Sequence, residues 1–350
     1  MLRFPLVLSW LTLAACGNPV VVALPEPSDA GQQLALDGGE VVDAGFDAGT
    51  PDAGRGPPWP IVFAHGFFGF DSFAGLDFFT YYFEVKDSLA AHGELEVFTP
   101  TVDPFNDSAT RSAQLERQIE TILALTGAAK VNVIAHSQGG LDTRLVAHRR
   151  PELFGAVITV STPHRGTPVS DLVARGLQDP QARAAVDAII SIAAPSLWSD
   201  ATKDSSITAA LAQFETSRMA AFNARVVDRP GVRFFSVAGR SALRRVADTC
   251  EADDGTRPPF IRTYDGTVDP VSPMLEATQF IISPNAFDPV GNDGLVPVES
   301  AKWGTFLGCI PADHLDEIGQ IGGLSPGLGN DWRHKPFYRS LVSFLRARGY

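Results

Sequence analysis

Several short apolar runs in this chain lead directly into turns of small residues. Residues 61–64 and residues 131–135 are the clearest examples, because both are rich in Val, Ile or Phe and both end at an alanine. Such runs are typical of strands that are covered on both faces of a parallel sheet. Residues 141–150 then have the pattern of a helix, and residues 156–160 that of a further strand. This alternation predicts an α/β domain.

The turn after residues 131–135 carries a serine at its tip. It reads AHSQGG over residues 135–140. An α/β-hydrolase places its nucleophile on such an elbow between a strand and a helix, usually within Gly-x-Ser-x-Gly. Ala135 replaces the first glycine here, but it is small enough for the close packing that the elbow requires. We interpret Ser137 as the nucleophile, and the alternative is an ordinary glycine-rich turn.

A second turn, after residues 61–64, begins with His65 and Gly66. In α/β-hydrolases a loop at this place supplies one backbone N–H of the oxyanion hole, and the residue after the nucleophile supplies the other. The N–H groups of Phe67 and Gln138 are therefore the expected donors. Each such donor lowers the reaction barrier by about 3 kcal/mol. The alternative, a turn closed only by glycines, leaves the His-Gly pair unexplained.

The chain order Ser, acid, His in an α/β-hydrolase places the other two triad members after Ser137. His148 and His164 come before any suitable acid. His334 stands at the start of the last predicted helix, where a capping or surface role is expected. His314 lies in a loop and is the expected general base.

Asp293 has the best position for the acid of the triad. It stands in an Asn-Asp-Gly turn that is expected to follow a strand, and it precedes His314 in the chain. Solvated aspartates are common in turn-rich stretches, so such stretches also contain competitors. The competing residues are Asp265, Asp269 and Asp288.

Six short motifs occur in a fixed order between Trp59 and the C-terminus. They are HGFFGFDS at 65–72, AHSQGG at 135–140, TPHRG at 162–166, AFNA at 221–224, NDGLV at 292–296 and HLDEIGQ at 314–320. Together they resemble the secreted bacterial triacylglycerol lipases, a family that binds calcium and commonly depends on a dedicated foldase. The resemblance implies an α/β-hydrolase fold, with a mostly parallel sheet flanked by helices. It also matches Ser137, Asp293 and His314 to the family's triad.

The resemblance further implies a structural calcium ion beside the histidine loop. The matching ligands are the carboxylate of Asp316 and the backbone carbonyls of Gln320 and Leu324. The family takes another carboxylate from the segment before its catalytic acid, and the matching residue is Glu276. Mixed oxygen ligands suit a hard cation. The ion would hold the His314 loop in place, and the alternative is that Glu276 and Asp316 are ordinary surface acids.

Residues 168–228 form a long insertion after the strand predicted at 156–160. Within it, residues 181–197 are unusually apolar for a peripheral helix. A helical lid that turns its apolar face to a lipid surface has this pattern, and so does a buried helix.

Residues 77–91 read as an amphipathic helix, whereas Phe67 and Phe68 are placed to line an acyl groove.

The N-terminal region predicts export. Residues 1–15 have the layout of a signal peptide, with an apolar stretch too short to span a bilayer. Leu-Ala-Ala-Cys at 13–16 resembles a bacterial lipobox, in which the cysteine, here Cys16, receives lipid. The alternative is an ordinary secreted protein with a chance cysteine. Residues 16–58 are rich in Ala, Gly, Pro and Asp, which predicts a disordered linker. Residues 59–350 are then the catalytic domain, anchored to a bacterial membrane, with the outer membrane favoured, or secreted.

The net charge, the cysteines and the cofactor motifs limit the partners, disulfides and cofactors to expect. The formal net charge of -12 argues against nucleic acid as a partner. If Cys16 carries lipid, Cys250 and Cys309 remain as an even pair in an oxidising compartment, which predicts a disulfide. No dinucleotide or phosphate-loop fingerprint stands in a suitable context, so we expect no organic cofactor.

The sequence therefore predicts a carboxylester hydrolase that works through a Ser-His-Asp triad and an acyl-enzyme. The expected protein is a monomeric triacylglycerol lipase, with an acylglycerol or another lipid ester as substrate at an interface and a foldase as partner. One alternative is a short-chain esterase or polyester depolymerase with the same triad and another groove. An alternative of a different class is a surface lipoprotein without turnover, which the intact triad disfavours.

Overall fold

The computed structural model describes most of the predicted catalytic domain. The described residues are 54–67, 81–176, 179–181, 211–241, 250–253, 257–264, 267, 269–285, 289–320, 323, 326–327 and 329–350. All of them belong to one compact unit, Thr50–Tyr350. Four predictions lie outside the described residues: the signal peptide with Cys16 and most of the linker, the groove residue Phe68, the greater part of the lid (182–210), and the ligand Leu324.

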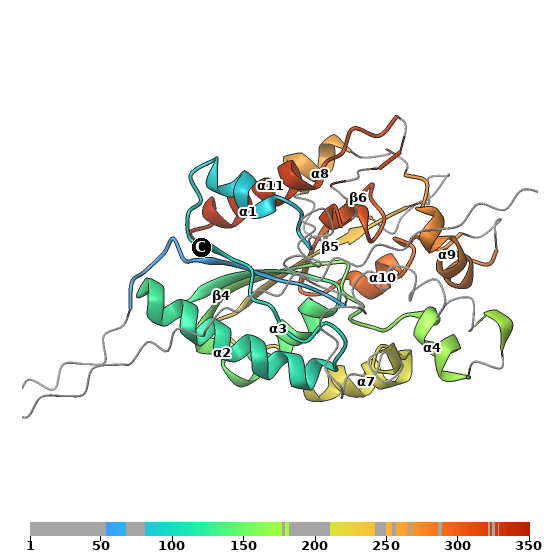
Figure 1. The fold of residues 1–350 in the computed structure, drawn as a ribbon, viewed down its shortest axis with the longest axis horizontal. Helices are drawn as coiled ribbons and strands as arrows, with labels where there is room; N and C mark the ends of the chain where they lie inside the picture. Colours follow the sequence, from blue (N-terminus) through green and yellow to red (C-terminus); the bar gives the residue numbers. More distant parts are fainter. Residues whose placement is uncertain are drawn as a thin grey trace, which may run out of the picture. The chain divides into compact units, whose positions relative to one another are not determined.

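Six parallel strands form a single sheet in the order β2-β1-β3-β4-β5-β6 (Figure 1). The strands are β1 (Ile61–Ala64), β2 (Val97–Phe98), β3 (Val131–His136), β4 (Phe154–Val160), β5 (Arg233–Gly239) and β6 (Thr305–Ile310). β3 and β4 are buried along their whole length, as expected for apolar strands covered on both faces. The prediction of a mostly parallel α/β sheet flanked by helices is confirmed.

Helices cover both faces of the sheet (Figure 1). The longer ones are α2 (Ser108–Thr126), α3 (Gln138–Arg149), α7 (Thr216–Arg225) and α11 (His334–Arg346), and the shorter ones are α1 (Val85–Ala90), α4 (Pro168–Ala174), α8 (Pro259–Thr263), α9 (Glu276–Ile282) and α10 (Val298–Ala301). The described residues also form the short 3-10 turns η1 (Pro151–Leu153), η2 (Pro273–Leu275) and η3 (Asp316–Ile318).

Each face of the sheet has its own hydrophobic core, because neighbouring residues of a strand point to opposite sides. In β1, Ile61 and Phe63 pack in one core with α1 and α11. Val62 and Ala64 pack in the other core with α2 and α3. In Figure 1, α1 and α11 accordingly lie on one side of the sheet, and α2 and α3 on the other.

The helix predicted at 77–91 is shorter in the structure, where α1 begins only at Val85. Tyr82 and Glu84 adopt left-handed backbone conformations, with φ of 56° and 51°. Such residues interrupt the hydrogen-bond ladder of a right-handed helix. The apolar periodicity before Val85 therefore reflects a packed turn in residues 81–84, in which Tyr82 is buried.

The carboxyl ends of the parallel strands meet at one edge of the sheet, where α/β proteins commonly place their sites. β3 is followed by Ser137, β4 by Ser161 and β5 by Arg240. The predicted disulfide is present between Cys250 and Cys309, the latter in β6. Among the described residues, no helix has the length and apolar character needed to cross a membrane.

Candidate active site

Ser137 occupies a strained elbow between β3 and α3. Its backbone has φ 54° and ψ -131°, a conformation that costs free energy for a residue with a side chain. The N–H of Ser137 donates to the carbonyl of Val160 at the end of β4, at 2.9 Å. The sheet therefore holds the elbow in place and presents the serine hydroxyl at its carboxyl edge.

Three glycines make this elbow sterically feasible. A Cβ atom on Gly139 would lie 2.3 Å from the carbonyl oxygen of Ala64, and one on Gly66 would lie 2.6 Å from Cβ of Ser137. A Cβ atom on Gly140 would lie 2.1 Å from a threonine hydroxyl. Ala135, in contrast, is a buried core residue of β3, which explains why this position accepts alanine.

The structure brings Ser137, His314 and Asp293 together as a hydrogen-bonded chain. His314 Nε2 lies 3.0 Å from Ser137 Oγ, and His314 Nδ1 lies 2.7 Å from Asp293 Oδ2. Oδ1 of Asp293 accepts the backbone N–H groups of Leu295 and Val296 at 2.9 and 2.7 Å. These donors orient a carboxylate that is completely buried. The arrangement suits a base that takes the serine proton and an acid that orients the base.

Asp293 reaches this position from a loop between α9 and α10, and not from a turn that directly follows a strand, as the sequence predicted. The loop is held by the N–H of Ser241, just after β5, which donates to the carbonyl of Asn292 at 2.7 Å. The N–H of His314 donates to the carbonyl of Asp293 at 2.9 Å. The acid is thus attached both to the sheet edge and to the base.

The competing residues lie elsewhere or outside the described part of the chain. His334 begins α11, and its Nε2 contacts the carbonyl of Phe83 at 2.9 Å. Asp269 belongs to a separate acidic group, whereas Asp265 and Asp288 fall outside the described residues.

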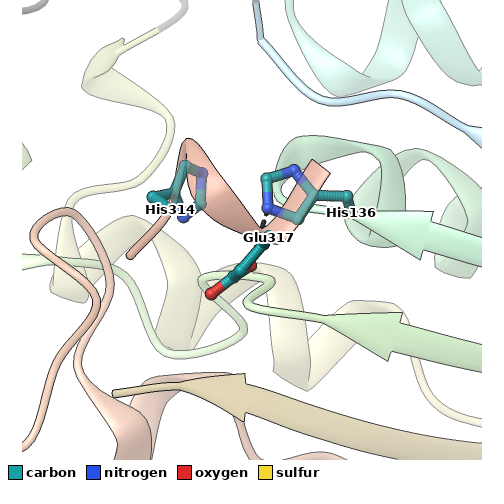
Figure 2. A group of neighbouring side chains, drawn as sticks. All are labelled: His136, His314 and Glu317. Carbon is teal, nitrogen blue, oxygen red and sulfur yellow. Dashed lines mark hydrogen bonds and ion pairs between the residues drawn. The ribbon is translucent and has the colours of Figure 1, made fainter. Parts of the chain in front are cut away.

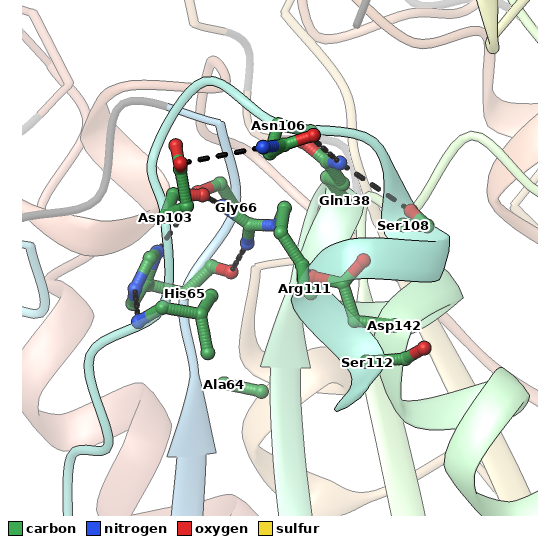
Figure 3. A network of polar contacts seen from close by, with 12 residues as sticks. Ala64, His65, Gly66, Asp103, Asn106, Ser108, Arg111, Ser112, Gln138 and Asp142 are labelled. Carbon is green, nitrogen blue, oxygen red and sulfur yellow. Dashed lines mark hydrogen bonds and ion pairs between the residues drawn. The ribbon is translucent and has the colours of Figure 1, made fainter. Parts of the chain in front are cut away.

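The described part of the predicted oxyanion loop comprises residues 65–67, and a buried arginine holds it (Figure 3). Arg111 donates to the carbonyl of His65 at 2.6 Å and pairs with Asp142 at 2.7 Å. The ring of His65 accepts the N–H of Val102 at Nε2 and contacts the carbonyl of Gly66 through Nδ1. Burial raises the pKa of Asp142 to about 6, although Arg111 opposes this.

The two predicted oxyanion donors come from two different segments of the chain. Phe67 lines the same cleft as Ser137 and packs edge-on against Phe105. Gln138 follows Ser137 as the first residue of α3, and its side-chain amide donates to the carbonyl of Asn106 at 2.9 Å (Figure 3).

A second polar group, which was not predicted from the sequence, lies next to the triad. It includes His136 and Glu317 (Figure 2). Both are buried and lie 2.8 Å apart between Nε2 and Oε2, and the ring of His136 packs 4.5 Å from that of His314. Burial and the nearby His314 lower the pKa of His136, whereas burial and the nearby Asp293 raise the pKa of Glu317. Both residues stand inside recognised motifs, yet nothing in the sequence shows that they meet.

A group of three acids gathers beside the His314 loop and includes the predicted ligand Asp316. Its other members are Asp269 and Asp313, and the carboxylate atoms lie within 4.8 Å of one another. Burial and the charge of Asp313 raise the pKa of Asp269 to about 7 and that of Asp316 to about 8. One oxygen of Asp269 is buried without a hydrogen-bond partner. These features fit a cation with oxygen ligands.

Two other predicted ligands, Glu276 and Gln320, have surroundings different from those of Asp316. Glu276, the first residue of α9, is exposed and is not part of the described acidic group. Glu276 was predicted because it is the carboxylate at the position that matches the family's ligand. In the structure, the loop before η2 places Asp269, and not Glu276, next to Asp316. Gln320 follows η3 and donates its N–H to the carbonyl of Leu315 at 3.1 Å.

An apolar cleft, partly open to solvent, lies over Ser137 and His314. Its walls come from the oxyanion loop, α4, the segment before α7 and the loops of the acid and the base. The apolar lining includes Phe67, Val169, Leu211, Phe214, Leu295 and Leu315. A chain of CH₂ groups fits such a surface better than a polar ligand does.

Residues 60–185, which contain β1 to β4 and the serine elbow, match the family model described as the alpha/beta hydrolase fold. The parallel sheet and its flanking helices agree with this match. The chain has the α/β-hydrolase fold.

The hydrolase is related to bacterial triacylglycerol lipases. It is 44% identical over 115 residues to a triacylglycerol lipase of Vibrio cholerae, a match that spans 33% of this chain and only 36% of that protein. It is 29% identical over 292 residues to the triacylglycerol lipase of Burkholderia plantarii, covering 76% of this chain and 80% of that one.

Solved structures show the same fold. The hydrolase aligns with the mature lipase BlEst2 of Bacillus licheniformis at a TM-score of 0.52 and 20% identity, over 82% of this chain and 94% of that one. It aligns with a metagenomic carboxyl esterase at a TM-score of 0.52 and 17% identity, over 83% and 76% of the two chains.

Proposed function

We propose that this hydrolase is a triacylglycerol lipase that cleaves long-chain acyl esters. The observation that carries the proposal is the Ser137–His314 contact at the base of an apolar cleft. The named function of the bacterial relatives supports the same substrate class. A glycerol ester presents an apolar chain and a carbonyl together, which is what this site accommodates.

In the proposed reaction, Ser137 Oγ attacks the ester carbonyl and His314 Nε2 takes the serine proton. The N–H groups of Phe67 and Gln138 bind the oxyanion that forms. Asp293 stabilises the imidazolium and fixes its tautomer. Collapse of the intermediate breaks the ester bond, and the leaving alcohol receives the proton from His314. Water, deprotonated by the same imidazole, then releases the fatty acid from Ser137.

We also propose that the acidic group beside the His314 loop binds Ca²⁺. Asp269 and Asp316 would supply the carboxylate oxygens, with Asp313 next to them. Support comes from the unpartnered oxygen of Asp269 and from the burial of three like charges at short distance. A divalent cation would neutralise this repulsion and hold the His314 loop against the loop before η2. It would take no part in ester cleavage.

For the N-terminal region, we propose export and lipid attachment at Cys16, with residues 16–58 as a spacer. The support is the lipobox-like sequence alone. Expression in a bacterium with labelled palmitate tests this proposal, because the full-length protein should incorporate the label and Cys16→Ser should not. As a partner, we propose a dedicated foldase. Refolding of the denatured protein without helper proteins would contradict the need for a foldase.

The decisive experiment measures hydrolysis by the full-length protein, with calcium present. Its substrates are an emulsified long-chain triacylglycerol and a soluble short-chain ester, and Ser137→Ala is the control. Preference for the emulsion, lost in the variant, is the expected result. Activity restricted to the soluble ester would assign the site to an esterase instead. A folded protein without either activity, and without labelling by a fluorophosphonate, would contradict the proposal.

A further inference from the structure

We propose that His136 is a positioning residue that fixes the oxyanion loop and the His314 loop relative to each other. The inference rests on the proposed function, because it concerns the efficiency of the same site. His136 is the last residue of β3 and directly precedes Ser137. Its ring is fully buried and has no access to substrate.

Both ring nitrogens of His136 have a partner from a different loop. Nδ1 lies 2.5 Å from the hydroxyl of Tyr81, and Nε2 lies 2.8 Å from Oε2 of Glu317. Tyr81 and Glu317 are separated from His136 by 55 and 181 positions in the sequence. One imidazole therefore connects two segments that are distant in the chain and that do not belong to the sheet.

The Glu317 side leads to the catalytic base. Glu317 lies in η3, three residues after His314, so the carboxylate and the base share one short loop. Its other oxygen accepts the hydroxyl of Ser161 at 2.6 Å, and Ser161 in turn accepts the N–H of Gly239 at 2.8 Å. The η3 turn is thereby attached to the carboxyl ends of β3, β4 and β5.

A glycine keeps the space that the Glu317 carboxylate needs. A Cβ atom on Gly239 would lie 1.8 Å from Oε1 of Glu317. The ring of His136 also packs 4.5 Å from the ring of His314, so it supports the base directly (Figure 2). A shift of the His136–Glu317 pair would move the base relative to Ser137.

The Tyr81 side leads to the oxyanion loop. The hydroxyl of Tyr81 lies against Gly66, since a Cβ atom on Gly66 would lie 2.5 Å from that oxygen. Tyr81 also lines the cleft above Ser137. The hydroxyl thus binds the His136 ring and packs against the residue that precedes the proposed oxyanion donor Phe67.

Burying the polar pair of His136 and Glu317 costs free energy, and this cost supports a functional reason for the pair. A fully buried carboxyl and imidazole lose their hydration, and well-packed apolar residues of similar size are commonly at least as stable. Hydrogen bonds, unlike apolar contacts, fix distance and direction. Small displacements of catalytic groups are expensive in rate, since about 1 Å costs on the order of 10²-fold.

The test is a double-mutant cycle in the full-length protein, with kcat, KM and melting temperature measured on a soluble ester that the wild type cleaves. Tyr81→Phe removes one partner of His136, and Glu317→Gln replaces the other, a carboxylate, by a neutral amide; both keep the side-chain size. Each should lower kcat about 10-fold and leave KM nearly unchanged, because ground-state binding is not altered. The matched control is Tyr338→Phe, whose buried hydroxyl has no hydrogen-bond partner in the structure and whose loss should leave kcat unchanged.

The two substitutions touch different loops, so their coupling is diagnostic. Because either one weakens the attachment of the same ring, the double variant should lose much less than the product of the single losses. In a His136→Gln background, Tyr81→Phe should have no further effect on kcat. This second cycle tests the positioning role of His136 even if Glu317→Gln does not fold.

Two outcomes would overturn the inference alone: independent, multiplicative losses in the cycles, or unchanged kcat in every folded variant. A folded wild type that cleaves no ester would overturn the proposed function first, and the inference with it.

Discussion

His314 Nε2 lies 3.0 Å from Ser137 Oγ although 177 positions separate the two residues in the chain. Ser137 follows β3, whereas His314 comes from the loop after β6, and β4 and β5 lie between these strands in the sheet. The loop of the base therefore extends across two strand ends to reach the serine. Its contact with Asp293 and the neighbouring polar network hold it there.

Asp293→Asn should reduce kcat by about 10⁴-fold with little loss of stability. The asparagine oxygen can still accept the N–H groups of Leu295 and Val296, so the loop should keep its shape. Its NH₂ group would then face Nδ1 of His314 and favour the wrong tautomer of the base. Steady-state kinetics on a soluble ester measures the loss. Asp87→Asn, at an exposed position of α1, is the control, and a loss below about 10-fold in Asp293→Asn would exclude Asp293 as the acid.

Gly139→Ala should destabilise the protein by about 3 kcal/mol, because the new Cβ would meet the backbone carbonyl of Ala64, which has no freedom to move aside. Urea unfolding measures this change. Gly56→Ala is the matched control, since no atom lies within 4 Å of its Cβ position, and its effect should stay within about 0.5 kcal/mol. Equal stability of the two variants would contradict the close packing of the elbow.

The parts of the site that the sequence predicted are those with a local signature. Ser137 stands in a strand-turn-helix pattern, and chain order then restricted the choice of Asp293 and His314. The metal ligands had no such signature, because a carboxylate site depends on how separate loops meet. Glu276 was therefore chosen by alignment, while the fold brings Asp269 to Asp316.

The network around His136 was hidden for the same reason. Each of its contacts joins residues from different loops, and each residue alone is an ordinary buried polar side chain. The left-handed turn at Tyr82 and Glu84 also has no signal in the sequence, since neither residue is one that favours positive φ. Tertiary packing decides both features.

Calcium should raise the free energy of unfolding, by about 2.7 kcal/mol when its concentration is a hundredfold above Kd. The physical reason is the repulsion among buried carboxylates that the ion would relieve. Melting curves with calcium and with a chelator measure the effect. Asp269→Asn should abolish the calcium-dependent rise in melting temperature, whereas Glu276→Gln, at the exposed position on α9, should retain it. The reverse pattern would restore Glu276 as a ligand.

The stability of the protein should fall in acid partly because of His65. Burial, together with the positive charge of Arg111, lowers the pKa of His65 from 6.5 to about 3 in the folded protein. Below pH 6.5 the unfolded chain takes up a proton that the folded protein does not bind. The stabilising contribution of the neutral ring is therefore complete above pH 6.5. It is lost by about 1.4 kcal/mol for each pH unit as the pH falls toward 3.

His65→Asn removes this proton uptake, and every other titrating group remains in both proteins. The variant should be less stable than the wild type at pH 7.5, because it loses the contacts with Val102 and Gly66. The difference should shrink by about 2 kcal/mol between pH 6.5 and pH 5. Urea unfolding at each pH measures it, with the exposed His92 replaced in the same way as control. A difference that stays constant over this range would show that His65 is protonated in the folded state, and its ring could then no longer accept the N–H of Val102 at Nε2.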